Sequence, residues 1–171
     1  MAADGQGLAG LWDDIKRRTT KPKEHATFVF YFLGAILFIG GLGIWVELIN
    51  AAGSWTETDL VALRTALTTF FIALIASSGF QLVLGEWKQL RAAAYMVSLL
   101  MAGLGIWLIA DRELDLKVAI PLSVIGYLIS LWIWWISNAD NTDLHDEPPP
   151  EASVGGELDR DLKGDLEGFD T

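Results

Sequence analysis

The sequence predicts an all-α membrane protein, a bundle of four transmembrane helices followed by a disordered acidic tail. Of the 171 residues, 52% are hydrophobic, and the mean hydropathy of +0.37 is high for a soluble domain. A helix of about 20 apolar residues spans a hydrocarbon core about 30 Å thick. Four runs reach that length with cores free of Asp, Glu, Lys, Arg and His, at residues 27–49, 66–84, 92–110 and 116–136.

The first run has an alternative interpretation as a cleaved signal peptide, because five basic residues precede it. Its length, and the lack of a small-x-small cleavage pattern before a polar segment, favour a retained helix. The runs also lack the alternation of barrel strands, and a backbone in lipid must satisfy its own hydrogen bonds. We therefore expect residues 27–136 to form a four-helix transmembrane domain.

Residues 1–26 are predicted to form a cytoplasmic segment with an amphipathic helix and a basic cluster. Apolar residues recur at i, i+3, i+4 and i+7, namely Leu8, Leu11, Trp12 and Ile15. Charged residues occupy the other face, at Asp13, Asp14, Lys16 and Arg17. Such a helix lies in the headgroup plane, where neighbouring basic residues attract anionic lipid. The alternative is that the segment merely flanks the first span.

The distribution of Lys and Arg predicts that both termini are cytoplasmic. Seven basic residues flank the first run or lie in the second loop, against three in the first and third loops, including Arg64. Because short cytoplasmic loops retain positive charge, the side with seven is inside. We expect a multi-pass protein of the cytoplasmic (inner) membrane. In the first loop, Ser54-Trp55-Thr56-Glu57 fits a capping box with Ser54 as the N-cap.

The chain changes character at about residue 137. From Asn138 to Thr171 there are eleven acidic and two basic residues, so this tail carries nearly all of the formal net charge of −10. Residues 137–171 are therefore predicted to be disordered and solvated. One apolar stripe, formed by Leu158, Leu162, Leu166 and Phe169, is typical of a segment that docks in the groove of a cytoplasmic partner.

The pentapeptide GLGIW occurs at residues 41–45 and again at 103–107. Each copy lies in a predicted helix that runs outward and precedes a returning helix, so the simplest interpretation is a tandem two-helix repeat. Its glycines Gly41, Gly43, Gly103 and Gly105 are predicted to permit close helix packing, with the first and third helices facing each other. The alternative, a glycine-lined ligand site, lacks polar partners other than Glu47.

The helix count and the two echoes loosely resemble bacterial inner-membrane proteins of the YiaA/YiaB type, which are built from tandem two-helix units with a Gly-Leu-Trp signature. Here the sequence is Gly-Ile-Trp, and the basic segment that usually follows each unit is missing. The resemblance covers only these features, so we do not assign the chain to that family.

A small and polar line runs along the second predicted helix. Its polar members recur at multiples of four residues, at Thr65, Thr69, Ser77 and Gln81. That spacing places them on one face of a helix. In lipid such a face is usually a helix–helix seam, and the alternative is the lining of a polar path in an oligomer.

The residue types needed for catalysis are sparse. The chain has no Cys, its two His residues lie outside the predicted spans, and no serine has a neighbouring base, so we expect no enzyme activity, cofactor or metal. The acidic tail disfavours nucleic acid. The favoured function is a small membrane scaffold or accessory subunit, within the lipid bilayer, as a homo-oligomer or in a larger complex. The alternative is an oligomeric channel or small transporter.

Overall fold

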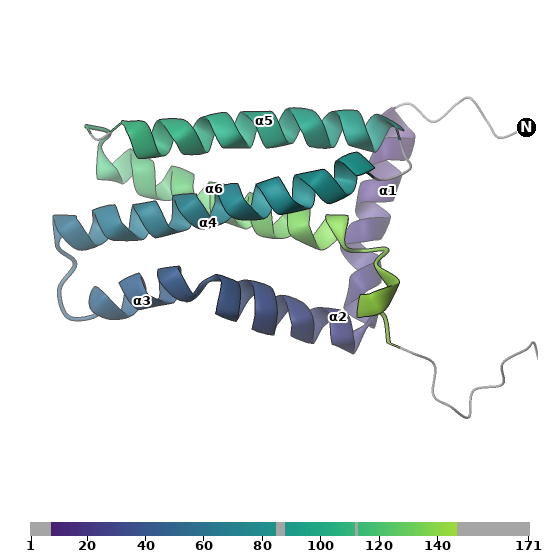
Figure 1. The fold of residues 1–171 in the computed structure, drawn as a ribbon, viewed down its shortest axis with the longest axis horizontal. Coiled ribbons are helices and arrows are strands. Elements are labelled where there is room, and N and C mark those ends of the chain that lie inside the picture. The colour runs from purple at the N-terminus through teal and green to yellow at the C-terminus, as the bar shows by residue number, and fades with distance from the viewer. Residues whose placement is uncertain (1–7, 85–87, 112, 147–171) are drawn as a thin grey trace, which may run out of the picture.

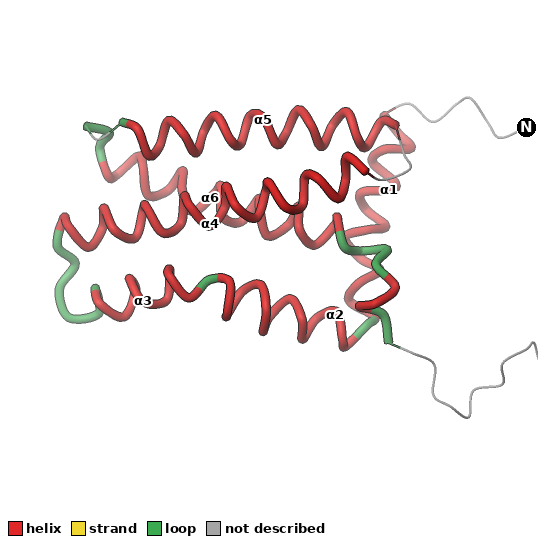
Figure 2. Tube along the Cα trace, viewed as in Figure 1, coloured by secondary structure: helices red, strands yellow, loops and turns green. Residues whose placement is uncertain are grey.

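The computed structural model describes residues 8–84, 88–111 and 113–146, and within these ranges it contains helices, turns and loops but no strand (Figure 2). Three helices are long and apolar enough to cross a membrane: α4 (Glu57–Leu84), α5 (Lys88–Ala110) and α6 (Leu116–Ser137). The predictions of an all-helical chain with membrane-spanning helices are confirmed to that extent.

The first predicted span is not one continuous α-helix. It comprises α2 (Ala26–Tyr31), a π-helical stretch η2 (Phe32–Gly40) and α3 (Leu42–Asn50), with a break at Gly41. Together these segments run alongside α4 (Figure 1). The prediction of a single regular helix over residues 27–49 is therefore wrong in its local structure. Glycines and π turns are common causes of such interruptions, and this run contains both.

Helix α4 begins at Glu57, well before the predicted residue 66. Its N-cap is Thr56, whose hydroxyl accepts a hydrogen bond from the Asp59 backbone N–H at 3.3 Å, while the Asp59 carboxylate accepts one from the Thr56 N–H at 2.9 Å. This reciprocal pair is a capping box. The prediction that Ser54 caps the helix is wrong by two residues, because Asp59, rather than Glu57, is the acidic partner.

Phe71 occupies the centre of the packed helices. Its side chain is fully buried in α4, and a Cβ on Gly126 of α6 would come within 2.9 Å of its ring. A Cβ on Gly105 of α5 would meet both Phe71 and Ile72. Glycines on α5 and α6 thus make room for a large aromatic ring, and this is why both helices approach α4 closely.

The order of the helices differs from the one that the repeat predicts. Helix α4 contacts α3, α5 and α6, and α3 and α5 lie on opposite sides of it (Figure 1). The prediction that the first and third helices face each other is therefore wrong. Among the predicted packing glycines, Gly105 packs against α4, whereas a Cβ on Gly43 or Gly103 would have no neighbour within 4 Å.

Helix α1 (Leu8–Thr20) lies across one end of the other helices. A short 3-10 turn, η1 (Lys21–Glu24), follows it, and the axis of residues 9–24 makes an angle of 94° with that of residues 26–40. Leu11 and Ile15 pack against the core, but Trp12 is 67% exposed and Asp14 is buried. The helix is present, but Asp14 on its predicted charged face is buried, and its placement in the headgroup plane stays a prediction.

The two glycines of the second GLGIW copy allow a matched test of this packing. We expect Gly105→Ala to destabilise the protein by about 1–3 kcal/mol, because the added methyl meets Ile72 and Phe71. Gly103→Ala, two residues away on an open face, is expected to be neutral or to stabilise α5 by up to about 1 kcal/mol. Thermal unfolding in detergent measures both, and equal midpoints would contradict the packing.

Candidate functional site

The predicted polar face of α4 is exposed rather than packed. Thr65, Thr69, Ser77 and Gln81 all have exposed side chains. The hydroxyl of Thr65 donates to the Val61 carbonyl oxygen at 2.9 Å, and that of Ser77 to the Leu74 carbonyl oxygen at 3.0 Å. Within one chain these residues are not a seam, so the seam prediction is wrong at that level. Their role as a path in an oligomer stays a prediction.

The polar seam of this structure joins α4 to α6, and its α4 residues are the immediate sequence neighbours of the predicted ones. Thr68 and Ser123 are both fully buried, and their hydroxyl oxygens lie 3.0 Å apart. Nearer the α1 end, Ser137 donates to the carbonyl oxygen of the buried Ser78 at 3.3 Å. Sequence reasoning missed this line because Thr68-Thr69 and Ser77-Ser78 each offer two adjacent hydroxyls. The buried line on α4 follows residues 68, 71, 75 and 78, and it differs from the predicted line because it includes the large side chain of Phe71.

A groove of about 410 Å³ runs between the first segment and α4, beside the exposed polar face. Its lining is small or apolar: Gly40, Gly43, Ile44, Ala66, Thr69, Phe70 and Ala73. The open space above Gly43 belongs to this groove. Small residues along an unfilled groove allow another helix to approach closely, which is how transmembrane helices associate without a hydrophobic driving force.

The first GLGIW copy has a local structural task that the second lacks. The indole N–H of Trp45 donates a hydrogen bond to the Leu37 carbonyl oxygen at 3.1 Å, across the break at Gly41. A Cβ on Gly41 would clash with that same carbonyl, so glycine is required there. Trp107 lies in the uninterrupted helix α5, and its indole N–H makes no hydrogen bond within the described residues. The echo therefore fills two different roles.

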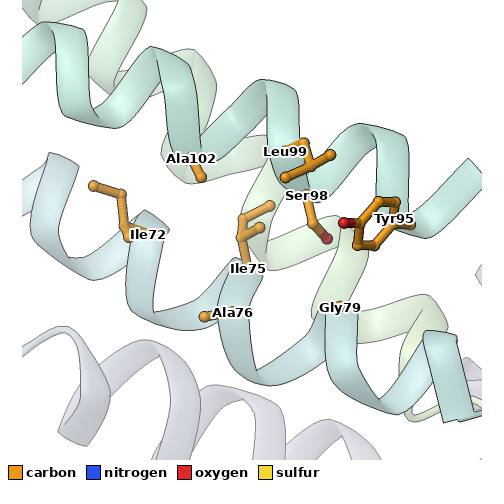
Figure 3. Close-up of a pocket in the computed structure, with 8 residues that line it drawn as sticks. All are labelled: Ile72, Ile75, Ala76, Gly79, Tyr95, Ser98, Leu99 and Ala102. Carbon is orange, nitrogen blue, oxygen red and sulfur yellow. The ribbon is translucent and has the colours of Figure 1, made fainter.

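A second groove, of about 280 Å³, separates α4 from α5. Figure 3 shows its lining, in which the Ser98 hydroxyl points toward Gly79 and Tyr95 lies at the edge. A Cβ on Gly79 would overlap the Ser98 oxygen, so the two helices meet closely there. The remaining lining is apolar, namely Ile72, Ile75, Ala76, Leu99 and Ala102. These groups offer space for a hydrocarbon chain but no acid or base for catalysis.

The most polar part of the described structure is a cluster of ion pairs between α1 and the residues after α6. Asp14, with only 5% of its side chain exposed, pairs with Arg17 at 2.7 Å and Arg18 at 2.8 Å. Asp140 pairs with the same two arginines at 2.8 Å and with Lys21 at 3.0 Å. The hydrogen bond from Arg17 lowers the pKa of Asp140, and in return Asp140 raises the pKa of Arg17.

A second set of contacts holds residues 144–146 against the start of α2. The Asp146 carboxylate accepts hydrogen bonds from the N–H groups of Ala26 at 2.8 Å and Thr27 at 2.9 Å, and its pKa is lowered mainly by hydrogen bonding to Thr27 and less by the bond from Ala26. His25 and His145 stack with ring centroids 4.1 Å apart. Together with the 3-10 turn η3 (Thr142–Leu144), these contacts fold residues 138–146. The predicted disorder from residue 137 is wrong for this stretch.

The tryptophans of α6 have a packing role that the sequence did not indicate. Trp134 is buried, and Trp135 packs edge-on against Phe28 and Phe32, with ring centroids 4.9 and 5.0 Å apart.

Arg64, predicted in the first loop, is instead buried in α4 two turns from its start. A long side chain at that depth can still reach the membrane surface. The predicted docking residues Leu158, Leu162, Leu166 and Phe169 lie outside the described residues.

Comparisons with protein-family models, curated proteins and solved structures give no match to this chain. Within the described ranges there is also no group of three or more His, Cys, Asp or Glu residues arranged to hold a metal ion.

The tryptophans of the two GLGIW copies allow a paired test of whether the indole hydrogen bond supports the break at Gly41. We expect Trp45→Phe to lower stability by about 1 kcal/mol, because the Leu37 carbonyl loses its indole donor. Trp107→Phe removes an indole N–H that makes no hydrogen bond in the described structure, so a change near zero is expected. Unfolding midpoints in the same detergent measure both, and equal losses would show that the indole bond does not support the break.

Asp140 gives the ion-pair cluster a predictable pH dependence. Because its folded-state pKa lies below the ordinary 3.8, its stabilisation is complete at neutral pH and is lost as the pH falls below 3.8. We expect Asp140→Asn to cost about 1 kcal/mol at pH 7, since the pair is partly exposed, and to flatten the acid loss of stability. Asp143→Asn, an exposed carboxylate on the same segment, is the control. Identical pH profiles of unfolding for wild type and Asp140→Asn would contradict the assignment.

Proposed function

We propose that this protein is a small integral membrane scaffold or accessory subunit, which assembles with itself or with a larger membrane complex. The observation that carries the proposal is the groove between the first segment and α4, together with the exposed polar face beside it. A polar face left against lipid is unfavourable, and a groove lined by Gly40, Gly43 and Ala73 admits a neighbouring helix. Association of a second chain would cover both features.

The position of α1 supports four membrane crossings. Three crossing helices, α4, α5 and α6, would put residue 57 and residue 137 on opposite sides of the bilayer. The ion pairs of Arg17 and Arg18 with Asp140 keep α1 beside the end of α6. The segment from Ala26 to Asn50 must then cross as well, as a broken span. Both termini would lie on one side, and the charge bias supports the cytoplasmic side of the inner membrane.

The tandem repeat and the tail belong to the same proposal. A duplicated two-helix unit would explain the paired echoes, with the copies having since diverged into a broken and a continuous helix. The acidic tail would leave the membrane surface at residue 146, next to the ion-pair cluster. Its stripe of Leu158, Leu162, Leu166 and Phe169 would then be presented to a cytoplasmic protein partner.

The exposed face of α4 also favours a second candidate, an oligomeric channel or small transporter. In a ring of chains, Thr65, Thr69, Ser77 and Gln81 would line a polar path, since four helices from one chain rarely enclose a pore. Ion flux into proteoliposomes that Ser77→Leu abolishes would favour this candidate over the scaffold.

An open glycine from each echo provides the test of assembly. Gly43→Leu is expected to fill the groove and to reduce the wild-type oligomer to single chains of 18.8 kDa, while leaving each chain folded, since its Cβ meets nothing within 4 Å. Gly103→Leu, equally open but outside this groove, is expected to leave the assembly intact. Light scattering in mild detergent, with capture of an untagged copy by a tagged one, measures the result. A monomeric wild type, or equal behaviour of the two variants, would count against self-assembly.

A further inference from the structure

A third groove, of about 250 Å³, lies between the first segment and α6 at the end covered by α1. Its walls are formed by Phe32 of η2 and by Leu131, Trp132 and Trp135 of α6. At the membrane-surface end, Thr19 and Lys23 complete the lining. The surface presented to the groove is apolar throughout, and Thr19 and Lys23 line it through their carbon atoms.

Hydrogen bonds hold the walls of this groove in place. The indole N–H of Trp132 donates to the Thr19 hydroxyl at 3.3 Å, and that of Trp135 donates to the Thr19 carbonyl oxygen at 3.2 Å. The ring of Trp135 also packs edge-on against Phe32, with centroids 5.0 Å apart. Both tryptophans are therefore fixed by α1, and the groove exists before anything binds.

Lys23 gives the groove a positive charge at its surface end. The neighbouring cations Arg17, Arg18 and Lys21 are already paired with Asp14 or Asp140. Lys23 is exposed and makes no ion pair within the described ranges. Of the basic cluster, Lys23 is thus the member that lines the groove and is available to an anion, although the exposed Glu24 lies next to it.

We infer that this groove is a binding site for an anionic phospholipid, with one acyl chain along Phe32 and Leu131 and the headgroup phosphate at Lys23. The size fits a chain better than a compact ligand, because small-molecule pockets are usually about 300–1,000 Å³. Tryptophan side chains prefer the headgroup level, where Trp132 and Trp135 would stand beside the lipid. The site does not depend on whether the protein assembles.

The test uses purified full-length protein from which lipid has been removed in mild detergent. It is titrated with phosphatidylglycerol, or with phosphatidylcholine of the same chains, and bound lipid is counted by native mass spectrometry. We expect preferential retention of phosphatidylglycerol, reduced about fivefold in Lys23→Gln and restored in Lys23→Arg. Lys16→Gln removes an exposed charge on α1 that does not line the groove, and is expected to change nothing.

Three outcomes would overturn the site. Equal retention of the two lipids would show that the headgroup charge is not recognised. Equal losses in Lys16→Gln and Lys23→Gln would show general attraction to the surface instead of a groove. Displacement of phosphatidylglycerol by millimolar inorganic phosphate would show that Lys23 binds phosphate without the acyl chain.

Discussion

The packing of Phe71 against glycines is the constraint on which the rest of the structure depends. One large ring, fully buried in α4, occupies space left by Gly105 on α5 and Gly126 on α6. In lipid the chain gains no hydrophobic advantage from associating helices, so close van der Waals packing must hold them together. Helix α4 consequently lies at the centre, and its opposite face, with Thr65 and Thr69, is left uncovered.

The ends of the helices are held by polar contacts, whereas the middle is held by packing. Asp14 and Asp140 pair with Arg17, Arg18 and Lys21, and the pairs of Asp140 keep α1 beside the end of α6. The same pairs reduce the positive charge that α1 presents to lipid. Attraction to anionic lipid is therefore expected to be weaker than the count of basic residues suggests, because within the described residues Lys16 and Lys23 are the members of the basic cluster without an ion pair.

Hydropathy was sufficient to predict an all-helical chain, and three of its four predicted spans correspond to α4, α5 and α6, which are long and apolar enough to cross a membrane. Hydropathy could not predict the break at Gly41, because an apolar run has the same hydropathy whether its helix is regular or interrupted. The four-residue periodicity also predicted the seam on the wrong face of α4. The adjacent hydroxyls of Thr68-Thr69 fit either line, and the deciding factor was the volume of Phe71, which needs glycines on two other helices. The ion pairs of Asp140 with α1 and η1 span more than a hundred residues, which no local pattern can indicate.

Ala26–Asn50 is proposed to cross the membrane, so that α1 and the end of α6 share one side. The chain has no cysteine, so single cysteines can be placed at the exposed positions Asp13, Trp55 and Thr142. A membrane-impermeant maleimide added outside intact cells is predicted to label Trp55→Cys at once, and Asp13→Cys and Thr142→Cys only after permeabilisation. Labelling of Asp13→Cys and Trp55→Cys from the same side would contradict the fourth crossing and the ion pairs that imply it.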